Sequence, residues 1–199
     1  MDTRWTIVAD PRFTELEGAL QERMALVAQT VQPENFASLL EPQSREILRR
    51  GFAEAGAHEG TVWLPDAAGK HLVPVFNTGP NAEKFVGKFQ QPLDVGLICM
   101  VFASEQPIVE NEVHQNAGQS KLLDNLLQVR THALMAAPFH FLRACRGVIS
   151  CVQLTTPGSP APAPRGFQFA DLTCLQRAGA LCSRLLELRL LSHAVGWPL

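Results

Sequence analysis

Apolar residues recur every three or four positions near both ends of the chain, a spacing that predicts helices there. They form a single stripe from Phe13 to Val31. A second helix is expected from about Gln43 to Ala55, with Gly56 as its C-terminal stop. A last helix is expected from Phe169 to about His193, with leucines over more than half of its circumference. Such a helix can pack on a sheet with one side and on another helix with the other.

Between these helices the apolar pattern changes to the period of strands. The segment GTVWLPDAAGKHLVPVF predicts two short strands around a turn that ends at Gly69. The segments GKFQQPL and QPIVE predict two further short strands. A helix from Val95 to Ser104 is expected between them, and Pro33 and Pro42 are expected to punctuate the chain upstream.

The second half of the central region predicts a short helix and two long strands. Ser120 to Val129 is expected to be an amphipathic helix with its four leucines facing inward. The segments THALMAAPFHF and RGVISCVQLTT follow as strands and are apolar at successive positions. A sheet wetted on one side would carry polar residues at every second position. We therefore expect a sheet that is covered on both faces.

Composition and charge narrow the class of protein. Apolar residues make up 46% of the 199 and charged residues 18%, against roughly 25% charged in an average globular chain, so a full core is expected. The net charge of −2 and the pI near 6.3 give no basic field for nucleic acid or anionic lipid. The N-terminus does not resemble a secretory signal, and prolines break the longest uncharged run. A soluble, cytoplasmic protein without membrane or nucleic-acid partners is expected.

The cysteines and histidines do not form a recognisable cofactor motif. Five cysteines are present, an odd number, with no CxxC pair and no histidines at zinc-finger spacing. The catalytic motifs GxSxG, HExxH, GxGxxG and the P-loop are also missing from the sequence. The sequence therefore favours a binding role over an enzymatic one, and it predicts neither catalytic residues nor metal ligands.

Several segments, in this order, resemble the GAF domain family. They are the hairpin GTVWLPDAAGKHLVPV, the stretch PLDVGLICMVFASEQPIVENEV, the strand LLQVRTHALMAAPFHF followed by RGVISCVQL, and the closing helix FQFADLTCLQRAGAL. The resemblance covers about Gln43 to Leu191. It implies an α+β, GAF-like and PAS-related fold, in which an antiparallel sheet is sandwiched between helices and the N- and C-terminal helices pack together. The expected parts are a helical extension over 1–42, a GAF-like domain over 43–193 and a tail over 194–199.

The resemblance also implies a ligand cavity beside the Val95 helix and the Pro107 strand. Cys99 would be a pocket thiol that contacts a ligand or senses oxidation, or a small buried hydrophobe. His114 would ligate haem iron or bind an anion, or be a partly solvated loop residue. Arg130 would pair with a carboxylate or phosphate, or cap the preceding helix. The full set of expected ligand-binding residues is Phe76, Asn77, Cys99, Phe102, His114, Arg130, Thr131, Ala133 and Met135.

The function that this resemblance implies is a small-molecule-binding sensory or regulatory domain, acting through a homodimer or a signalling partner protein. The ligand and any cofactor are not identified by the sequence. Thr155-Thr156 and Asp171-Leu172 replace the residue pairs of the cyclic-nucleotide-binding branch, so that ligand is not expected. Two alternatives remain: a redox enzyme of the free methionine sulfoxide reductase type, and a dimerisation scaffold whose pocket is filled by side chains.

Overall fold

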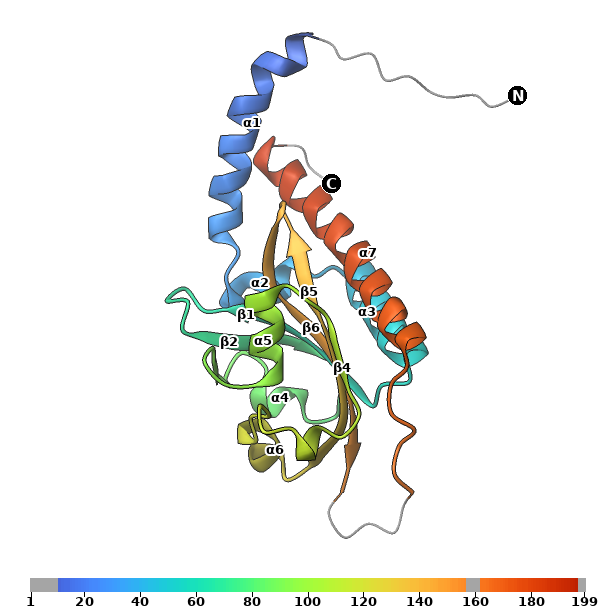
Figure 1. Cartoon of the computed structure of the whole chain (residues 1–199). Helices are drawn as coiled ribbons and strands as arrows, with labels where there is room; N and C mark the ends of the chain where they lie inside the picture. Colours follow the sequence, from blue (N-terminus) through green and yellow to red (C-terminus); the bar gives the residue numbers. More distant parts are fainter. Residues whose placement is uncertain (1–10, 157–161, 197–199) are drawn as a thin grey trace, which may run out of the picture.

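The computed structural model describes residues 11–156 and 162–196, and the side chains from residue 17 onward. One six-stranded antiparallel sheet, in the order β3-β2-β1-β6-β5-β4, forms the centre of the molecule (Figure 1). Its strands are β1 (Glu59–Pro65), β2 (His71–Asn77), β3 (Gln91–Pro92), β4 (Ile108–Glu110), β5 (Arg130–Phe141) and β6 (Ala144–Thr155). The long β5–β6 hairpin and the β1–β2 hairpin agree with the strands predicted from the sequence.

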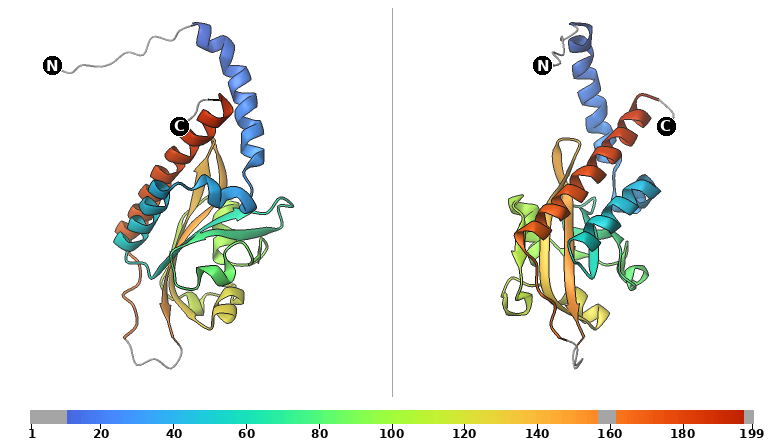
Figure 2. Two further views of the ribbon diagram at one scale, coloured as in Figure 1. Left: turned by 180° about the vertical axis from the view of Figure 1, so that it is seen from behind. Right: turned by 90° about the vertical axis from the view of Figure 1, so that its right-hand side faces the viewer.

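Helices cover both faces of this sheet, as Figure 2 shows. On one face lie α1 (Pro11–Thr30), α2 (Pro33–Leu39), α3 (Pro42–Glu54) and α7 (Phe169–Ala194). On the other lie α4 (Ala82–Phe85), α5 (Leu97–Ser104), the 3-10 turn η1 (Val113–Gln115) and α6 (Leu122–Leu127). The α1 helix contacts α7, so the terminal helices pack together (Figure 1). The α+β sandwich expected from the sequence is confirmed.

Each face of the sheet has its own hydrophobic core. The larger core joins α2, α3 and α7 to the sheet, and it includes Phe36, Phe52 and Leu175. The smaller core lies under α5 and includes Trp63, Cys99 and Val148. Because the side chains of a strand alternate between the two faces, the same strands supply both cores. This is why the sequences of β5 and β6 are apolar at successive positions.

A close approach of two helices fixes the larger core. A Cβ atom built on Gly51 of α3 would collide with the Cβ atom of Ala178 on α7. The two helices can therefore pack closely only because position 51 has no side chain.

A side-chain hydrogen bond caps the start of α7. Asp171 accepts this bond from the Gln168 backbone N–H (2.8 Å).

Two side chains hold the return of the chain into α7. Asn111, just after β4, accepts a hydrogen bond from the Phe167 backbone N–H (2.7 Å) and donates one to the Phe167 carbonyl (3.0 Å). Gln153 of β6 accepts a hydrogen bond from the Gly166 backbone N–H (2.9 Å). These contacts fix the start of α7 beside the edge of the sheet that ends in β4.

Two details of the helices differ from the sequence prediction. Pro33 and Pro42 are the first residues of α2 and α3, because proline is favoured at the first position of a helix; α2 was not expected. In α6 the prediction that all four leucines face inward is wrong. Leu122 and Leu126 are 49% and 54% exposed, and no residue of α6 is fully buried.

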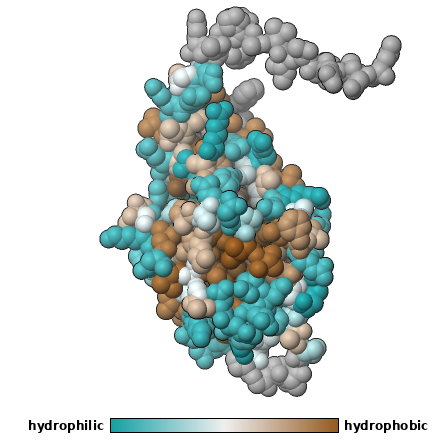
Figure 3. Space-filling view, viewed as in Figure 1, coloured by the Kyte–Doolittle hydropathy of each residue, from teal (hydrophilic) through white to brown (hydrophobic). Residues whose placement is uncertain are grey.

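The surface shows where the two layers leave the sheet partly uncovered. Figure 3 shows apolar side chains gathered in the middle of the face seen in Figure 1, between α5 and the start of α7. The edge strand β4 lies there, with Ile108 half-buried and Val109 36% exposed.

Within the described residues, none of the helices combines the length and apolar character needed to cross a membrane.

Candidate functional site

Strand alternation places polar side chains on the sheet face that α5 and α6 cover. Glu59, Thr61 and Trp63 of β1 share this face with Ser150 and Val152 of β6. Their neighbours along each strand point to the opposite core. A cavity lies between these side chains, the start of α5, α6 and the segment 113–120, and its volume is about 90 Å³.

Glu59 is the most unusual group in this cavity. It begins β1 and is only 7% exposed. Its carboxylate accepts one side-chain hydrogen bond, a long one of 3.5 Å from Asn77 Nδ2. Burial raises the pKa of Glu59, and the hydrogen bond from Asn77 and the nearby His58 oppose this only in part. Gly79 packs against the carboxyl group, with no room for a Cβ atom. Within the described part of the chain, the Glu59 carboxylate is therefore buried without a strong partner.

The other polar groups on this part of the sheet hold one another in place. Asn77 Nδ2 also donates to Thr61 Oγ1 (2.9 Å), and Asn77 Oδ1 accepts from the Gly79 backbone N–H (2.6 Å). Trp63 Nε1 donates to Ser150 Oγ (2.9 Å). These bonds fix the orientation of the side chains around Glu59 and leave its carboxylate as the group with spare acceptor capacity.

Asp124 attaches α6 to the sheet. Its carboxylate accepts hydrogen bonds from Thr131 Oγ1 (2.7 Å) and from the Thr131 backbone N–H (2.9 Å). Gln119 Nε2 also donates to it (3.2 Å). Since no residue of α6 is fully buried, these hydrogen bonds are its main specific attachment to β5, and α6 closes one side of the cavity.

Two buried polar atoms beside the cavity have no hydrogen-bond partner among the described residues. They are Ser120 Oγ, which lines the cavity, and His114 Nδ1. His114 lines a second hollow of about 260 Å³ beside α6, together with Lys121 and Arg130. Buried polar atoms are nearly always paired with protein groups, with water or with a ligand. Either atom can therefore form a hydrogen bond with a bound molecule or with water.

The charged side chains that line the cavity are all acidic among the described residues. Two carboxylates, those of Glu59 and Asp124, lie in its wall, and no Lys, Arg or His is among the described residues that line it. Electrostatic interactions are stronger in such a partly dry site than in water. The cavity can therefore bind a cation or a hydrogen-bond donor, and it repels an anion.

The nine residues predicted from the sequence fall into separate places. Asn77 and Thr131 line the cavity, whereas His114 and Arg130 line the second hollow. Cys99 and Phe102 pack in the core under α5. Phe76, Ala133 and Met135 belong to the opposite core. A register shift between Thr131 and Ala133 separates these two residues onto different faces. The ligand-binding roles assigned to the nine residues stay predictions.

The polar cavity residues Glu59, Ser120 and Asp124 are among those that sequence reasoning missed. The signal for Glu59 was available, because a charged residue alternates with Thr61 at the start of an apolar strand. Ser120 and Asp124 carried no such signal. Their place follows from how the segment after η1 folds over the sheet.

The cysteines resemble core residues. Cys99 Sγ donates a weak hydrogen bond to the Pro92 carbonyl (3.2 Å). Burial raises the pKa of Cys99 to about 11, with a smaller contribution from Asp94, and it raises that of Cys182 to about 12. Burial also raises the pKa of Cys151. Because the thiolate is the reactive form, these environments do not favour the redox alternative. All five thiols are free.

Comparisons with known proteins agree with this architecture. The family model of the GAF domain matches residues 15–186. Similar solved structures include GAF domains of phosphoenolpyruvate-protein phosphotransferases from Acinetobacter (16% identity, TM-score 0.57, 95% of this chain and 99% of that chain) and Coxiella burnetii (16%, 0.59, 89% and 96%). The free methionine-R-sulfoxide reductase of Neisseria meningitidis, solved with its substrate, is 18% identical (TM-score 0.52, 98% and 99%). No curated protein sequence matches the chain. At these identities the structural likeness shows the fold.

Proposed function

The chain belongs to the GAF domain family, and from this premise we propose that it is a sensory or regulatory domain whose cavity binds a small cationic molecule. The ligand class is that of amines, amidines and guanidines, which carry N–H donors and a positive charge. Domains of this family generally serve signalling and ligand binding. The acidic wall of the cavity supports this class of ligand.

The observation that carries the proposal is the buried carboxylate of Glu59. A buried charge is costly unless it is paired and hydrogen-bonded, and among the described residues the Glu59 carboxylate has only the long bond from Asn77. An ammonium or guanidinium group beside Glu59 would supply both a counter-charge and strong hydrogen bonds. Ser120 Oγ, which has no partner among the described residues, would accept a further N–H. Phosphate-bearing ligands such as cyclic nucleotides would instead meet two carboxylates.

The size of the cavity limits the ligand further. Ligand pockets for drug-sized molecules are about 300 to 1,000 Å³, and this cavity is about 90 Å³. In the described conformation only a molecule of a few heavy atoms, or the head of a larger one, would fit. A longer ligand requires α6 to move away from the sheet, which would break the hydrogen bonds between Asp124 and Thr131.

The output of the domain would pass through a homodimer formed by α7. Leu181, Leu185 and Leu188 are 50%, 37% and 54% exposed. Their spacing of four and three residues puts them in one stripe on the outer side of the helix. A second copy of the same stripe would cover these leucines in the manner of a two-helix seam. A signalling partner protein could use the same surface in place of the second copy.

Light scattering on the purified chain tests the dimer. We expect the mass of a dimer for the wild type and of a monomer for Leu185→Glu. Leu122→Glu places the same charge on an exposed leucine of α6 and should leave the dimer intact. A monomeric wild type would contradict this part of the proposal and leave the ligand class to be tested separately.

Binding is tested with a charge-matched panel. Thermal unfolding and calorimetry with putrescine, agmatine and ethanolamine should show stabilisation, and acetate and cyclic AMP should show none. Glu59→Gln should abolish the stabilisation, whereas Glu54→Gln, an identical change at an exposed position of α3, should keep it. Native mass spectrometry of the protein as purified gives an independent check. An anionic molecule that co-purifies, or equal binding by Glu59→Gln, would refute the ligand class. No response to any compound would favour the scaffold alternative.

A further inference from the structure

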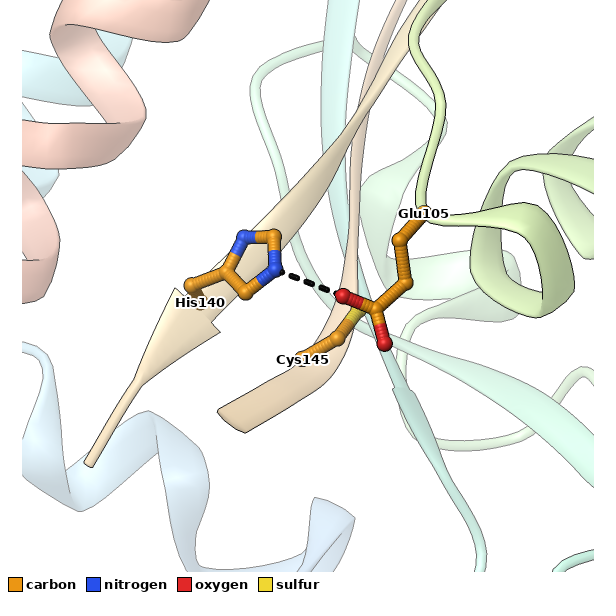
Figure 4. A group of neighbouring side chains, drawn as sticks. All are labelled: Glu105, His140 and Cys145. Carbon is orange, nitrogen blue, oxygen red and sulfur yellow. Dashed lines mark hydrogen bonds and ion pairs between the residues drawn. The ribbon is translucent and has the colours of Figure 1, made fainter. Parts of the chain in front are cut away.

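Outside the cavity, the described residues bring one group of three different metal-binding side chains together. Glu105, His140 and Cys145 meet beside the end of the β5–β6 hairpin, on the side of α5 (Figure 4). Their carboxylate oxygen, imidazole nitrogen and sulfur atoms all lie within 4.8 Å of one another. Glu105 Oε2 and His140 Nε2 are 3.0 Å apart.

The fold itself places these three side chains on one side of the hairpin. His140 and Cys145 face each other across β5 and β6 as a paired register position. Side chains directly opposite in a sheet lie close together on the same face. The neighbours of His140, Phe139 and Phe141, point to the opposite core, so His140 must point away from it. The approach of His140 to Cys145 therefore follows from the pairing of the two strands and does not depend on the rotamer of either side chain.

Glu105 arrives from a different element and in an unusual backbone conformation. It is the C-cap residue of α5 and has a left-handed φ of 54°. Non-glycine residues adopt this conformation uncommonly. The sharp turn after α5 directs the Glu105 side chain to the hairpin, where it meets His140 (Figure 4).

We propose that Glu105, His140 and Cys145 form a Zn²⁺ site with an open fourth position. Zinc is bound in proteins by Cys, His and carboxylate ligands, and three protein ligands with one open position are typical of non-structural sites. With bonds of about 2.0 to 2.3 Å and tetrahedral angles, the donor atoms would be about 3.3 to 3.8 Å apart. The present spread of up to 4.8 Å shrinks to this value by small side-chain rotations.

The surroundings allow those rotations and leave room for the fourth ligand. The side chains of His140 and Glu105 are 49% and 55% exposed, so both can adjust without disturbing the core. Both also border a hollow of about 550 Å³ between the β5 strand and α7. Because both side chains are exposed, a water molecule can reach the ion and complete the coordination.

Two features of the site determine how it binds the ion. Cys145 is half-buried and donates a weak hydrogen bond to the Gly147 carbonyl (3.4 Å), and the ion displaces its thiol proton on binding. Arg143 lies in the wall of the same hollow and opposes a cation. Arg143 opposes all divalent cations equally, and it is the thiol and imidazole donors that favour Zn²⁺ over Mg²⁺ or Ca²⁺, which prefer oxygen ligands.

The experiment uses the full chain, freed of metal with a chelator that is then removed. Zn²⁺ is titrated in competition with a chromophoric chelator, and Co²⁺ serves as a spectroscopic probe of thiolate ligation. We expect one Zn²⁺ per chain, and a thiolate-to-cobalt charge-transfer band in the near ultraviolet. Mg²⁺ at the same concentration should not compete.

Ligand variants give the decisive comparison. Cys145→Ser should remove the charge-transfer band, and Cys145→Ser and His140→Gln should each weaken Zn²⁺ binding by more than the roughly 10- to 100-fold typical of an outer-shell change. Glu105→Gln should weaken it less, because the amide oxygen can still coordinate. Cys174→Ser and His193→Gln, which change the same residue types on α7, should bind as the wild type does.

The proposal is overturned if Zn²⁺ does not bind stoichiometrically, or if binding is unchanged in both Cys145→Ser and His140→Gln. Circular dichroism of the metal-free variants excludes misfolding as the cause of any loss. Glu59→Gln should leave Zn²⁺ binding unchanged, so this result stands or falls independently of the ligand proposed for the cavity.

Discussion

Replacing Glu59 by glutamine should make the unliganded protein more stable. The wild-type carboxylate is 7% exposed and has one side-chain hydrogen bond, of 3.5 Å. Leaving a buried polar group without a good partner costs about 1 to 3 kcal/mol. Glutamine keeps the size of the side chain and removes the buried charge. We expect a gain of about 1 kcal/mol in the free energy of unfolding, or about 2 to 4 °C in Tm for a chain of this length.

The pH dependence of this gain has a definite sign. Burial raises the pKa of Glu59 above its ordinary value of 4.5. Below that value the carboxyl group is protonated in both the folded and the unfolded protein, and glutamine brings little benefit. As the pH rises, the unfolded protein loses its proton first, so the stability of the wild type falls until the folded-state pKa is passed. The advantage of Glu59→Gln should therefore grow with pH and then level off.

Chemical denaturation followed by circular dichroism, repeated from pH 4 to pH 8, measures this difference. Glu54→Gln is the matched control, since Glu54 is exposed on α3, and its difference from the wild type should stay small at every pH. If Glu59→Gln were less stable than the wild type at neutral pH, or if its advantage did not depend on pH, the carboxylate would have a partner that this reasoning omits. In that case the argument for a cationic ligand would fail as well.

Three further predictions concern the packing of α3 on α7, the attachment of α6 and the start of α7. Gly51→Ala should destabilise the protein by about 1 to 3 kcal/mol in denaturant titrations, because the new methyl group collides with α7. The control Gly18→Ala has open space around the new methyl group and should stabilise the protein by about 0.5 to 1 kcal/mol. Thr131→Val removes the hydroxyl donor to Asp124 and should speed hydrogen exchange in residues 119–128 at a cost of about 1 kcal/mol; unchanged exchange would contradict the attachment of α6. Asp171→Asn should lower stability by about 1 kcal/mol at neutral pH. Because Arg165 lowers the pKa of Asp171, the stabilisation by this carboxylate disappears as the pH falls and the group becomes protonated, so the loss should shrink at low pH. A loss that is constant with pH would contradict this account.

The sequence was sufficient for the layers of the fold. Alternating and continuous apolar runs identified both hairpins, and the absence of a polar face on β5 and β6 predicted that helices cover both sides. The spacing of leucines likewise predicted α7 almost to its ends. These signals are local, and each depends only on the period of one element.

The residues of the site were harder to predict, because strand register decides on which face of the sheet each side chain lies. From period two alone, Thr131, Ala133 and Met135 should share a face, but the irregularity after Thr131 sends the last two to the opposite core. No local pattern encodes such a bulge. Glu105 lies 35 or more positions before His140 and Cys145, so spacing rules for metal motifs could not find this cluster. The exposed leucines of α6 show a third limit, since helical period does not tell how deeply a short helix is buried.

The long hairpin of β5 and β6 belongs equally to both layers. Thr131 and Ser150 face the cavity, whereas Met135 and Ile149, on the same two strands, pack in the core that contains α7. The β5–β6 hairpin therefore connects the wall of the cavity to the inner side of α7, and the exposed leucines lie on the outer side of the same helix. If α7 forms the proposed dimer, we expect substitutions that reshape the wall of the cavity to change the pairing of subunits as well, and the reverse.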